Sequence, residues 1–284
     1  MPVAYDLRGV AGIEAGTSFD VINPNAIIIV SETQRDLLAN SKNVVWEDGG
    51  NYMSRYIELQ DGNRINKNIT ITANSVKYER TLTGKYSTIT VPFDSNVPYG
   101  MKAYALTGYS DEGSDVRLLF DQVTTLSAGV PYIIDAAAGK QTVQNDNTVT
   151  VTFNENTTQP AGATADKAHF HGNFTYRTNI PSGDNIYTLK GNGDGMLYHH
   201  VGGRITEFRG FFQLPDDASS KEYRVVLNGE TDGIRSIENG ELRIDKQGSA
   251  PTGKANSDYF NLAGQRVSGD YKGIVIKNGK KVKQ

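Results

Sequence analysis

The sequence predicts an all-β protein, in which an antiparallel β-sandwich follows a small cap and precedes a short C-terminal β segment. The 284 residues include 15 Tyr and 10 Phe, with many Thr and Val, and such side chains suit a pleated, half-buried surface. The apolar runs are short and are separated by clusters of Gly, Asn and Asp, which favour turns. Several runs alternate apolar and polar residues, the period of a strand with one buried face.

Residues 1–74 are predicted to form the cap. Residues 26–30 are five consecutive apolar residues, typical of a strand that is buried on both faces. Ser31 and Gln34 then have the spacing of a capping box, so a short helix should follow. Residues 44–46 indicate the next strand. The order strand, short helix, strand predicts a parallel step.

Residues 75–230 are predicted to form the sandwich, and residues 180–227 show its construction most clearly. Gly202 and Gly203 separate two apolar runs and favour a two-residue hairpin turn, because Gly tolerates positive φ. The run from Arg204 to Leu214 is therefore predicted to be a strand paired with the run before it. Alternate positions of this strand would face the core: Thr206, Phe208, Phe212 and Leu214.

Residues 231–284 are predicted to form the C-terminal β segment. Residues 246–258 are rich in Gly, Ser and Ala and indicate a linker or loop. A strand is expected over residues 259–267. Asn278-Gly279 is the strongest short hairpin signal of the chain and predicts a terminal hairpin.

Two stretches resemble segments of known protein families. Residues 6–13, followed by Asn23-Pro24-Asn25, are similar to the last rung of a leucine-rich-repeat protein. Near the C-terminus, Leu-x-Gly-x-x-Val and then Gly-Ile-x-Ile-x-Asn-Gly-Lys-Lys-Val resemble the sorting segment of proteins exported by type IX-like secretion. The matching positions are Leu262, Gly264, Arg266, Val267, Gly273, Ile274, Ile276, Asn278, Gly279, Lys280, Lys281 and Val282.

Together, the two resemblances imply the C-terminal portion of a bacterial cell-surface leucine-rich-repeat protein. Such a protein would be extracellular or attached to the cell surface, where it would adhere to host proteins, glycans or other cells. Met1 is followed by neither a basic segment nor an apolar run, so no signal peptide is predicted. The patterned sequence from Ala4 onward favours a chain that begins inside a longer protein.

Charge and composition exclude several classes of partner. The formal net charge of −3 is too small to attract nucleic acid or an acidic membrane, although five lysines crowd the last thirteen residues. No apolar run is long enough to span a membrane. The chain has no Cys, which excludes disulfides, thiolate metal sites and cysteine catalysis. We expect a monomer.

Aromatic side chains near residues 47–51 are the predicted ligand surface. Trp46, Tyr52 and Tyr56 lie in or beside this stretch rich in Gly and Asn, where rings could stack on sugars or anchor a protein partner. The alternative interpretation is that the single Trp belongs to the core.

The four histidines occur as two close pairs. His169 and His171 are separated by one residue and share a face of their predicted strand. His199 and His200 lie on a strand that we expect to be its neighbour, where alternation points them to opposite faces. A zinc site needs three or four converging ligands, so we predict no metal site and no cofactor.

Catalytic motifs are absent in recognisable form. Asp111, Glu112 and Asp115 cluster among Gly and Ser, which indicates a solvated loop rather than the paired carboxylates of a glycosidase. We therefore predict a non-catalytic module for adhesion or ligand binding. Two alternatives stay open: a carbohydrate-processing accessory domain or enzyme fragment, and a purely structural spacer or anchor.

Overall fold

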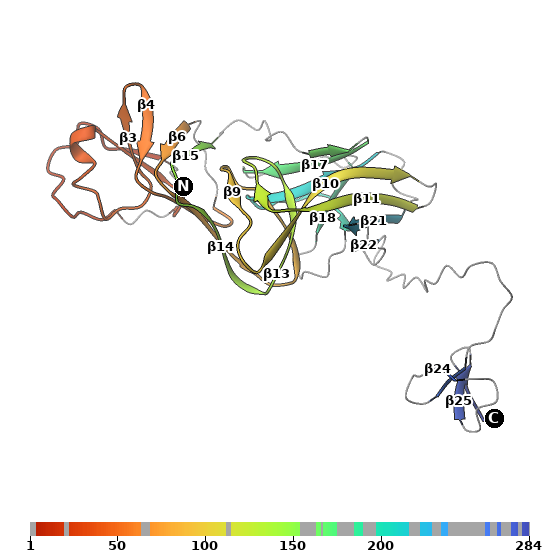
Figure 1. The fold of residues 1–284 in the computed structure, drawn as a ribbon. Helices are drawn as coiled ribbons and strands as arrows, with labels where there is room; N and C mark the ends of the chain where they lie inside the picture. The colour runs from red at the N-terminus through yellow and green to blue at the C-terminus, as the bar shows by residue number, and fades with distance from the viewer. Residues whose placement is uncertain are drawn as a thin grey trace. The chain divides into compact units, whose positions relative to one another are not determined.

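A computed structural model describes residues 4–19, 23–63, 69–111, 115–153, 163–165, 167–174, 185–189, 197–215, 222–228, 234–237, 259–261, 266–267, 274–277 and 280–283. The prediction of an all-β protein is confirmed (Figure 1). Within these ranges, the one helical element is a single 3₁₀ turn, η1 (Glu32–Gln34). No helix of the described chain is long and apolar enough to cross a membrane.

The described strands form five sheets. The first, which we call the cap sheet, contains in spatial order β1 (Ala4–Asp6), β2 (Ile27–Val30), β3 (Val44–Asp48), β4 (Asn51–Ser54), β6 (Ile69–Ala73) and β15 (Val149–Phe153). A three-stranded sheet contains β14 (Gly139–Asn145), β7 (Val76–Leu82) and β5 (Ile57–Gln60). A two-stranded sheet pairs β12 (Thr125–Leu126) with β9 (Ser95–Asn96).

The largest sheet has eleven strands. Their spatial order is β16 (Ala163–Ala165), β17 (Ala168–Asn173), β20 (Arg209–Gln213), β18 (Ile186–Leu189), β19 (Leu197–His199), β22 (Ile234–Ile237), β21 (Glu222–Leu227), β11 (Asp115–Val123), β10 (Met101–Asp111), β13 (Tyr132–Ala136) and β8 (Tyr86–Ile89).

The cap begins with parallel strands, as predicted. β1 pairs with β2, and β2 with β3, in parallel register. All four residues of β2 are buried, because the strand has a packed core on each face. The capping box forms at η1: the Gln34 side-chain oxygen accepts a hydrogen bond from Ser31 N at 2.9 Å. The Gln34 amide group then donates to the carbonyl oxygens of Leu7 and Val10, which ties the first segment to the cap.

Two buried asparagines join the first part of the cap, residues 23–43, to β5 of the three-stranded sheet. The Asn43 side chain accepts from Glu58 N at 2.7 Å and donates to Glu58 O at 3.0 Å, and Asn25 bonds Gln60 N and O in the same way. Each side-chain amide thus makes the two hydrogen bonds that the backbone of a neighbouring strand would otherwise make. This satisfies backbone groups of β5 that are buried and need partners. Asn43 also has positive φ, 56°, which Asn tolerates better than most residues.

The eleven-stranded sheet is curled, with half-barrel character, and does not form a clear sandwich. Most of its pairs are antiparallel, but β11–β21 and β19–β22 are parallel. The sheet curls far enough for its last strand, β8, to reach β20: the Thr88 hydroxyl accepts from Gly210 N at 2.9 Å and donates to Gly210 O at 3.0 Å. Gly210 also leaves room for the Phe170 ring of the neighbouring strand β17, since a Cβ at position 210 would lie 2.5 Å from that ring.

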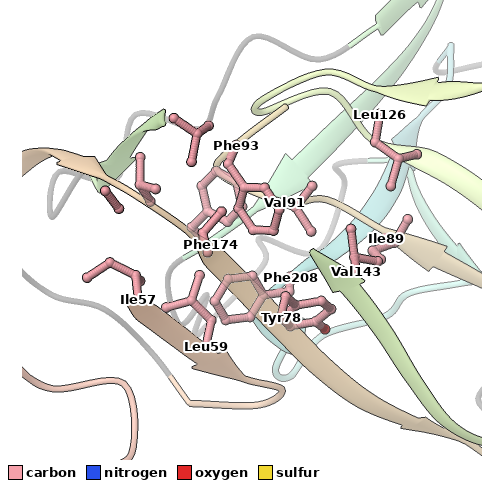
Figure 2. Close-up of a cluster of buried hydrophobic side chains, with 14 of the residues drawn as sticks. Ile57, Leu59, Tyr78, Ile89, Val91, Phe93, Leu126, Val143, Phe174 and Phe208 are labelled. Carbon is pink, nitrogen blue, oxygen red and sulfur yellow. The ribbon is translucent and has the colours of Figure 1, made fainter. Parts of the chain in front are cut away.

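Two large cores share the strands β10 and β13. The larger of the two, which we call the large core, contains Tyr78, Phe93, Phe174 and Phe208 (Figure 2). It lies between the cap sheet, the three-stranded sheet and one face of β8, β10 and β13. The curled-sheet core contains Phe120, Phe170, Phe212 and Tyr223. Ile133 belongs to the curled-sheet core and Ile134 to the large core, although they are adjacent in the chain. Both faces of β13 are therefore buried.

The predicted pairing around Gly202-Gly203 is wrong. β19 pairs with β18 and β22, whereas β20 pairs with β17 and β18, so β19 and β20 form no hairpin. The predicted strand over 204–214 also begins only at Arg209. Phe208 has φ 61° and Glu207 is buried, so the predicted alternation does not hold through residues 206–208. Phe211 and Phe212 are both buried because they belong to different cores on the two faces of β20.

The chain divides into two compact units, Met1–Leu242 and Arg243–Gln284, rather than at residues 74 and 230. β15 completes the cap sheet and β22 belongs to the largest sheet, so neither predicted boundary separates the strands. The second unit contains β24 (Arg266–Val267), β23 (Tyr259–Asn261), β25 (Ile274–Lys277) and β26 (Lys280–Lys283) in one antiparallel sheet.

The terminal hairpin is confirmed, because β25 and β26 pair with Lys277 opposite Lys280. Seven of the positions that match the sorting segment lie in these strands: Arg266, Val267, Ile274, Ile276, Lys280, Lys281 and Val282. The remaining five lie outside the described residues: Leu262, Gly264, Gly273, Asn278 and Gly279.

Candidate functional site

A hollow of about 270 Å³ opens beside Trp46 at the cap. One wall comes from residues 35–42, which follow η1, and the other from β3 and the turn after β4. The lining includes Arg35, Leu38, Lys42, Trp46, Arg55 and Tyr56. Two of the three predicted ligand residues, Trp46 and Tyr56, thus meet at one hollow. We call it the Trp46 hollow.

Trp46 is both a core residue and part of the hollow's lining. It is only 8% exposed and packs with Leu38 and Val44 in a small core on the outer face of the cap sheet. The Arg35 guanidinium lies 5.2 Å from the centre of its ring, within the range of a cation–π contact. The indole N–H is buried and has no hydrogen-bond partner among the described residues. Most of the Trp46 side chain is therefore buried in the core, as the alternative interpretation of the sequence expected.

Tyr56 presents a half-buried ring held by charges. Its hydroxyl donates to Glu58 at 3.1 Å, and the Lys77 ammonium lies 5.9 Å from the ring centre. Burial, with help from the Glu58 carboxylate, raises the pKa of this hydroxyl above its ordinary value. The hydroxyl therefore stays protonated at neutral pH and remains a donor.

Tyr52, the third predicted residue, lies elsewhere. In β4 it is opposite Glu47, and it packs against the large core. Trp46 and its cross-strand neighbour Met53 belong to the small core on the other face of the same sheet. Strand alternation thus separates Tyr52 from Trp46.

Three cations surround the Trp46 hollow, and no carboxylate lines it among the described residues. Asp36 pairs with Arg55 and lies 3.9 Å from Arg35, while Glu58 pairs with Lys42. The cations are thus partly neutralised by acids outside the lining. A hollow whose lining includes a tryptophan, a tyrosine, two arginines and a lysine can contact the apolar face of a sugar and bind its hydroxyl or acidic groups.

The histidines are farther apart than predicted. His169 and His171 share a face of β17, with ring centres 5.9 Å apart, but β20 and β18 lie between β17 and the strand of His199. Within the described residues, no three His, Asp or Glu side chains are grouped as metal ligands would be. Asp111 is exposed at the end of β10, whereas Glu112 lies outside the described residues.

A larger hollow, of about 350 Å³, was not predicted from the sequence. Its lining includes Arg80, Ser87, Thr188, His200, Arg204 and Arg209. We call it the arginine cavity. Arg80 is separated in the chain from the other two arginines by more than a hundred residues, so no local motif could indicate that they meet. The alternation of β7 was a partial signal, because it places Arg80 on the buried face with Tyr78 and Leu82.

Comparisons with known proteins give no relative: no protein-family model, no curated protein and no solved structure matches this chain.

Proposed function

We propose that this chain is a non-catalytic module displayed outside a bacterial cell, where it binds a glycan or a protein through the Trp46 hollow. The observation that carries the proposal is the meeting of Trp46, Tyr56 and three cations at one concave place. Aromatic and arginine side chains are enriched where protein surfaces bind partners tightly.

The resemblances to the last rung of a leucine-rich-repeat protein and to a sorting segment support the proposed location. Parallel strands β1 to β3 fit a repeat-derived cap, in which a terminal rung closes a stacked core. The β25–β26 hairpin carries the Ile-x-Ile and Lys-Lys-Val parts of the sorting pattern. In this proposal the cap binds and the C-terminal segment directs export.

Tryptophan fluorescence tests the binding site directly, since Trp46 is the only Trp of the chain. The purified protein is titrated with a panel of neutral and acidic oligosaccharides and of extracellular-matrix proteins. We expect at least one of them to change the emission in a saturable way. Arg55→Gln removes one cation of the rim and should weaken that binding about tenfold, the effect of a lost charge-assisted contact.

Arg8→Gln is the matched control, because Arg8 also pairs with an exposed aspartate, Asp6, but lies outside the hollow. Tyr52→Phe is a second control on the other face of the sheet. Equal binding by Arg55→Gln and Arg8→Gln would contradict the placement of the site. No binding by any member of the panel would favour the structural spacer.

Export is tested separately. Residues 231–284 are fused to a periplasmic reporter in a bacterium with type IX secretion. The fusion should appear at the cell surface, and replacement of both Lys280 and Lys281 by Ala should retain it in the periplasm. Equal surface display of the two fusions would contradict a sorting role for these lysines.

A further inference from the structure

The arginine cavity lies within the first compact unit, between strands distant in the sequence. The end of β7 and the start of β8 form one side, and the end of β18 together with residues 200–210 forms the other. Its volume, about 350 Å³, is at the lower end of the ~300–1,000 Å³ range of small-molecule sites. The cavity can therefore hold a ligand of monosaccharide size.

The charges around the arginine cavity do not balance. Arg80, Arg204 and Arg209 line it, and no carboxylate of the described residues does. Behind the lining, Asp61 makes a two-pronged ion pair with Arg209, with Nη2 and Oδ2 2.5 Å apart, and Glu207 pairs with Arg204 at 2.6 Å. Each of these carboxylates is thus engaged by its own arginine.

Arg80 is the cation left over. Its side chain is only 9% exposed, and its nearest carboxylate oxygen, on Asp61, is 4.0 Å away and is already bonded to Arg209. Its other contacts are neutral: Nη1 donates to Thr88 O at 2.6 Å, and Nη2 donates to the Ser87 hydroxyl. A buried guanidinium favours the entry of an anion when its hydrogen bonds go only to neutral acceptors and its nearest carboxylate, 4.0 Å away, is shared with another arginine.

Two buried nitrogen atoms that belong to residues lining this cavity have no hydrogen-bond partner among the described residues: Arg80 Nε and His200 Nε2. Buried polar atoms usually have partners, and leaving one unpaired costs about 1–3 kcal/mol. Arg80 Nε–H is a donor, and His200 Nε2 is a donor in one tautomer or when charged. Both atoms are suited to the same kind of ligand, an acceptor.

Burial and the charge of Arg209 lower the pKa of Arg80 to about 10, so Arg80 still carries its charge at neutral pH. An anion in the cavity would offset the repulsion between the two guanidinium groups. The forked guanidinium matches the oxygen atoms of carboxylate, sulfate and phosphate groups. The rest of the lining is rich in hydroxyls, including those of Ser87, Thr188 and Thr206.

We propose that the arginine cavity binds a small oxyanion, a carboxylate, sulfate or phosphate carried on a polar body no larger than a monosaccharide, with Arg80 as its principal ligand. This site is distinct from the Trp46 hollow, since no residue lines both.

Nuclear magnetic resonance of the arginine Nε–H groups tests the proposal in the complete chain. The probes are sodium sulfate and sodium glucuronate, with glucose as the neutral analogue of glucuronate and sodium chloride at matched ionic strength. The Arg80 Nε–H signal is assigned by its disappearance in Arg80→Lys. We expect sulfate, glucuronate or both to shift this signal in a saturable way, whereas glucose and chloride leave it unchanged.

The two anions distinguish the source of the oxyanion. A response to glucuronate alone supports a carboxylated sugar, and a response to sulfate alone supports an inorganic or ester oxyanion. Calorimetry should show binding about tenfold weaker in Arg80→Gln, the value of one lost charge-assisted contact, and unchanged in Arg8→Gln. His200→Gln should weaken binding as well and keeps the test valid if the Arg80 variants unfold.

Three results would overturn the proposal: no saturable shift with either anion, the same affinity in Arg80→Gln as in the unmodified chain, or equal binding of glucose. Trp46 emission should not follow the titration. The failure of this site and the failure of the Trp46 hollow can thus be told apart.

Discussion

Arg209, Asp61 and Tyr78 show how single residues hold distant parts of the chain together. Arg209 and Asp61 are 148 positions apart, and their forked pair is completed by the Tyr78 hydroxyl, which donates to Asp61 at 2.6 Å. Burial would raise the pKa of Asp61, but the hydrogen bonds from Arg209 and Tyr78 and the nearby cations outweigh it, and the pKa lies below its ordinary value. Asp61 is therefore charged at neutral pH and balances Arg209.

Asp61→Asn should lower the free energy of unfolding by about 2–4 kcal/mol at neutral pH, because it leaves Arg209 largely buried without a counter-charge. Urea unfolding measures the change. Asp36→Asn removes the ion pair with the half-exposed Arg55 and a looser contact with Arg35, 3.9 Å away; Asp36 itself is largely exposed, so the effect should stay below about 1 kcal/mol. Equal effects of the two substitutions would show that the Asp61 pair is no stronger than a surface pair.

At the scale of the element, β5 connects the first part of the cap, residues 23–43, to the three-stranded sheet of the first unit. Its backbone is bonded by Asn25 and Asn43 from the cap, and it pairs in parallel with β7. From β5, the Glu58 side chain, 7% exposed, pairs with Lys42 of the cap and with Lys77 of β7, at 3.1 Å for the latter. The strand thus joins the two parts both by backbone bonds and by charge.

Because of Glu58, the protein should become less stable in acid. Burial would raise its pKa, but hydrogen bonds from Lys42, Lys77 and Tyr56 lower it to about 2. The contribution of this carboxylate is therefore complete above its unfolded pKa, about 4.5, and is lost as the pH falls toward 2. Glu58→Gln should destabilise the protein by about 1–3 kcal/mol at pH 6, and this difference should shrink as the pH falls toward 2.5.

Urea unfolding of both proteins across this pH range measures the difference. Glu47→Gln, which changes a half-exposed carboxylate beside Arg8, is the control and should leave the profile unaltered. A difference between Glu58→Gln and the unmodified chain that stays constant with pH would contradict the assignment to Glu58.

At the scale of the whole molecule, the two compact units predict where the chain can be shortened. β22 pairs with β19 and β21 and so belongs to the first unit, although it lies beyond residue 230. Removal of residues 243–284 should leave the unfolding free energy of the first unit within about 0.5 kcal/mol, because a compact unit has its own core.

Removal of residues 231–284 is the matched comparison. It also deletes β22, and the lost ladder bonds, worth ~0.5–1.5 kcal/mol each, should lower stability by at least about 1–3 kcal/mol. Calorimetry and urea unfolding of both shortened chains measure the effects. Equal stability of the two would show that β22 contributes nothing to the first unit.

Much of the local structure could be predicted from neighbouring residues. Three local signals, each spanning a few positions, led to structures that form. The apolar run ending at Val30 lies in a parallel step, Ser31 and Gln34 make the capping box, and Asn278-Gly279 lies between the strands of the terminal hairpin. The Gly202-Gly203 prediction failed because strand pairing depends on distant parts of the chain. β19 pairs with β18 and β22, and a turn signal between two strands does not determine which strands they pair with.

The candidate sites depend on long-range packing to a greater degree. Trp46 and Tyr56 could be selected as aromatic residues near one loop, but the separation of Tyr52 follows from which face of β4 is covered by which core. The only local signal for the arginine cavity was the alternation of β7, which buries Arg80; it could not show that Arg80 and Arg209 meet, because they do so only when the sheet curls and β8 reaches β20.

By itself, the sequence determined the all-β class, the short strands and the terminal hairpin, since these follow from the period of apolar residues and from the φ angles that Gly and Asn allow. Only the tertiary structure decided the order of the strands, the curl of the eleven-stranded sheet and the meeting of three arginines. Those features depend on how apolar surface is buried and charges are paired across the whole first unit. No short stretch of sequence contains the residues that make these contacts.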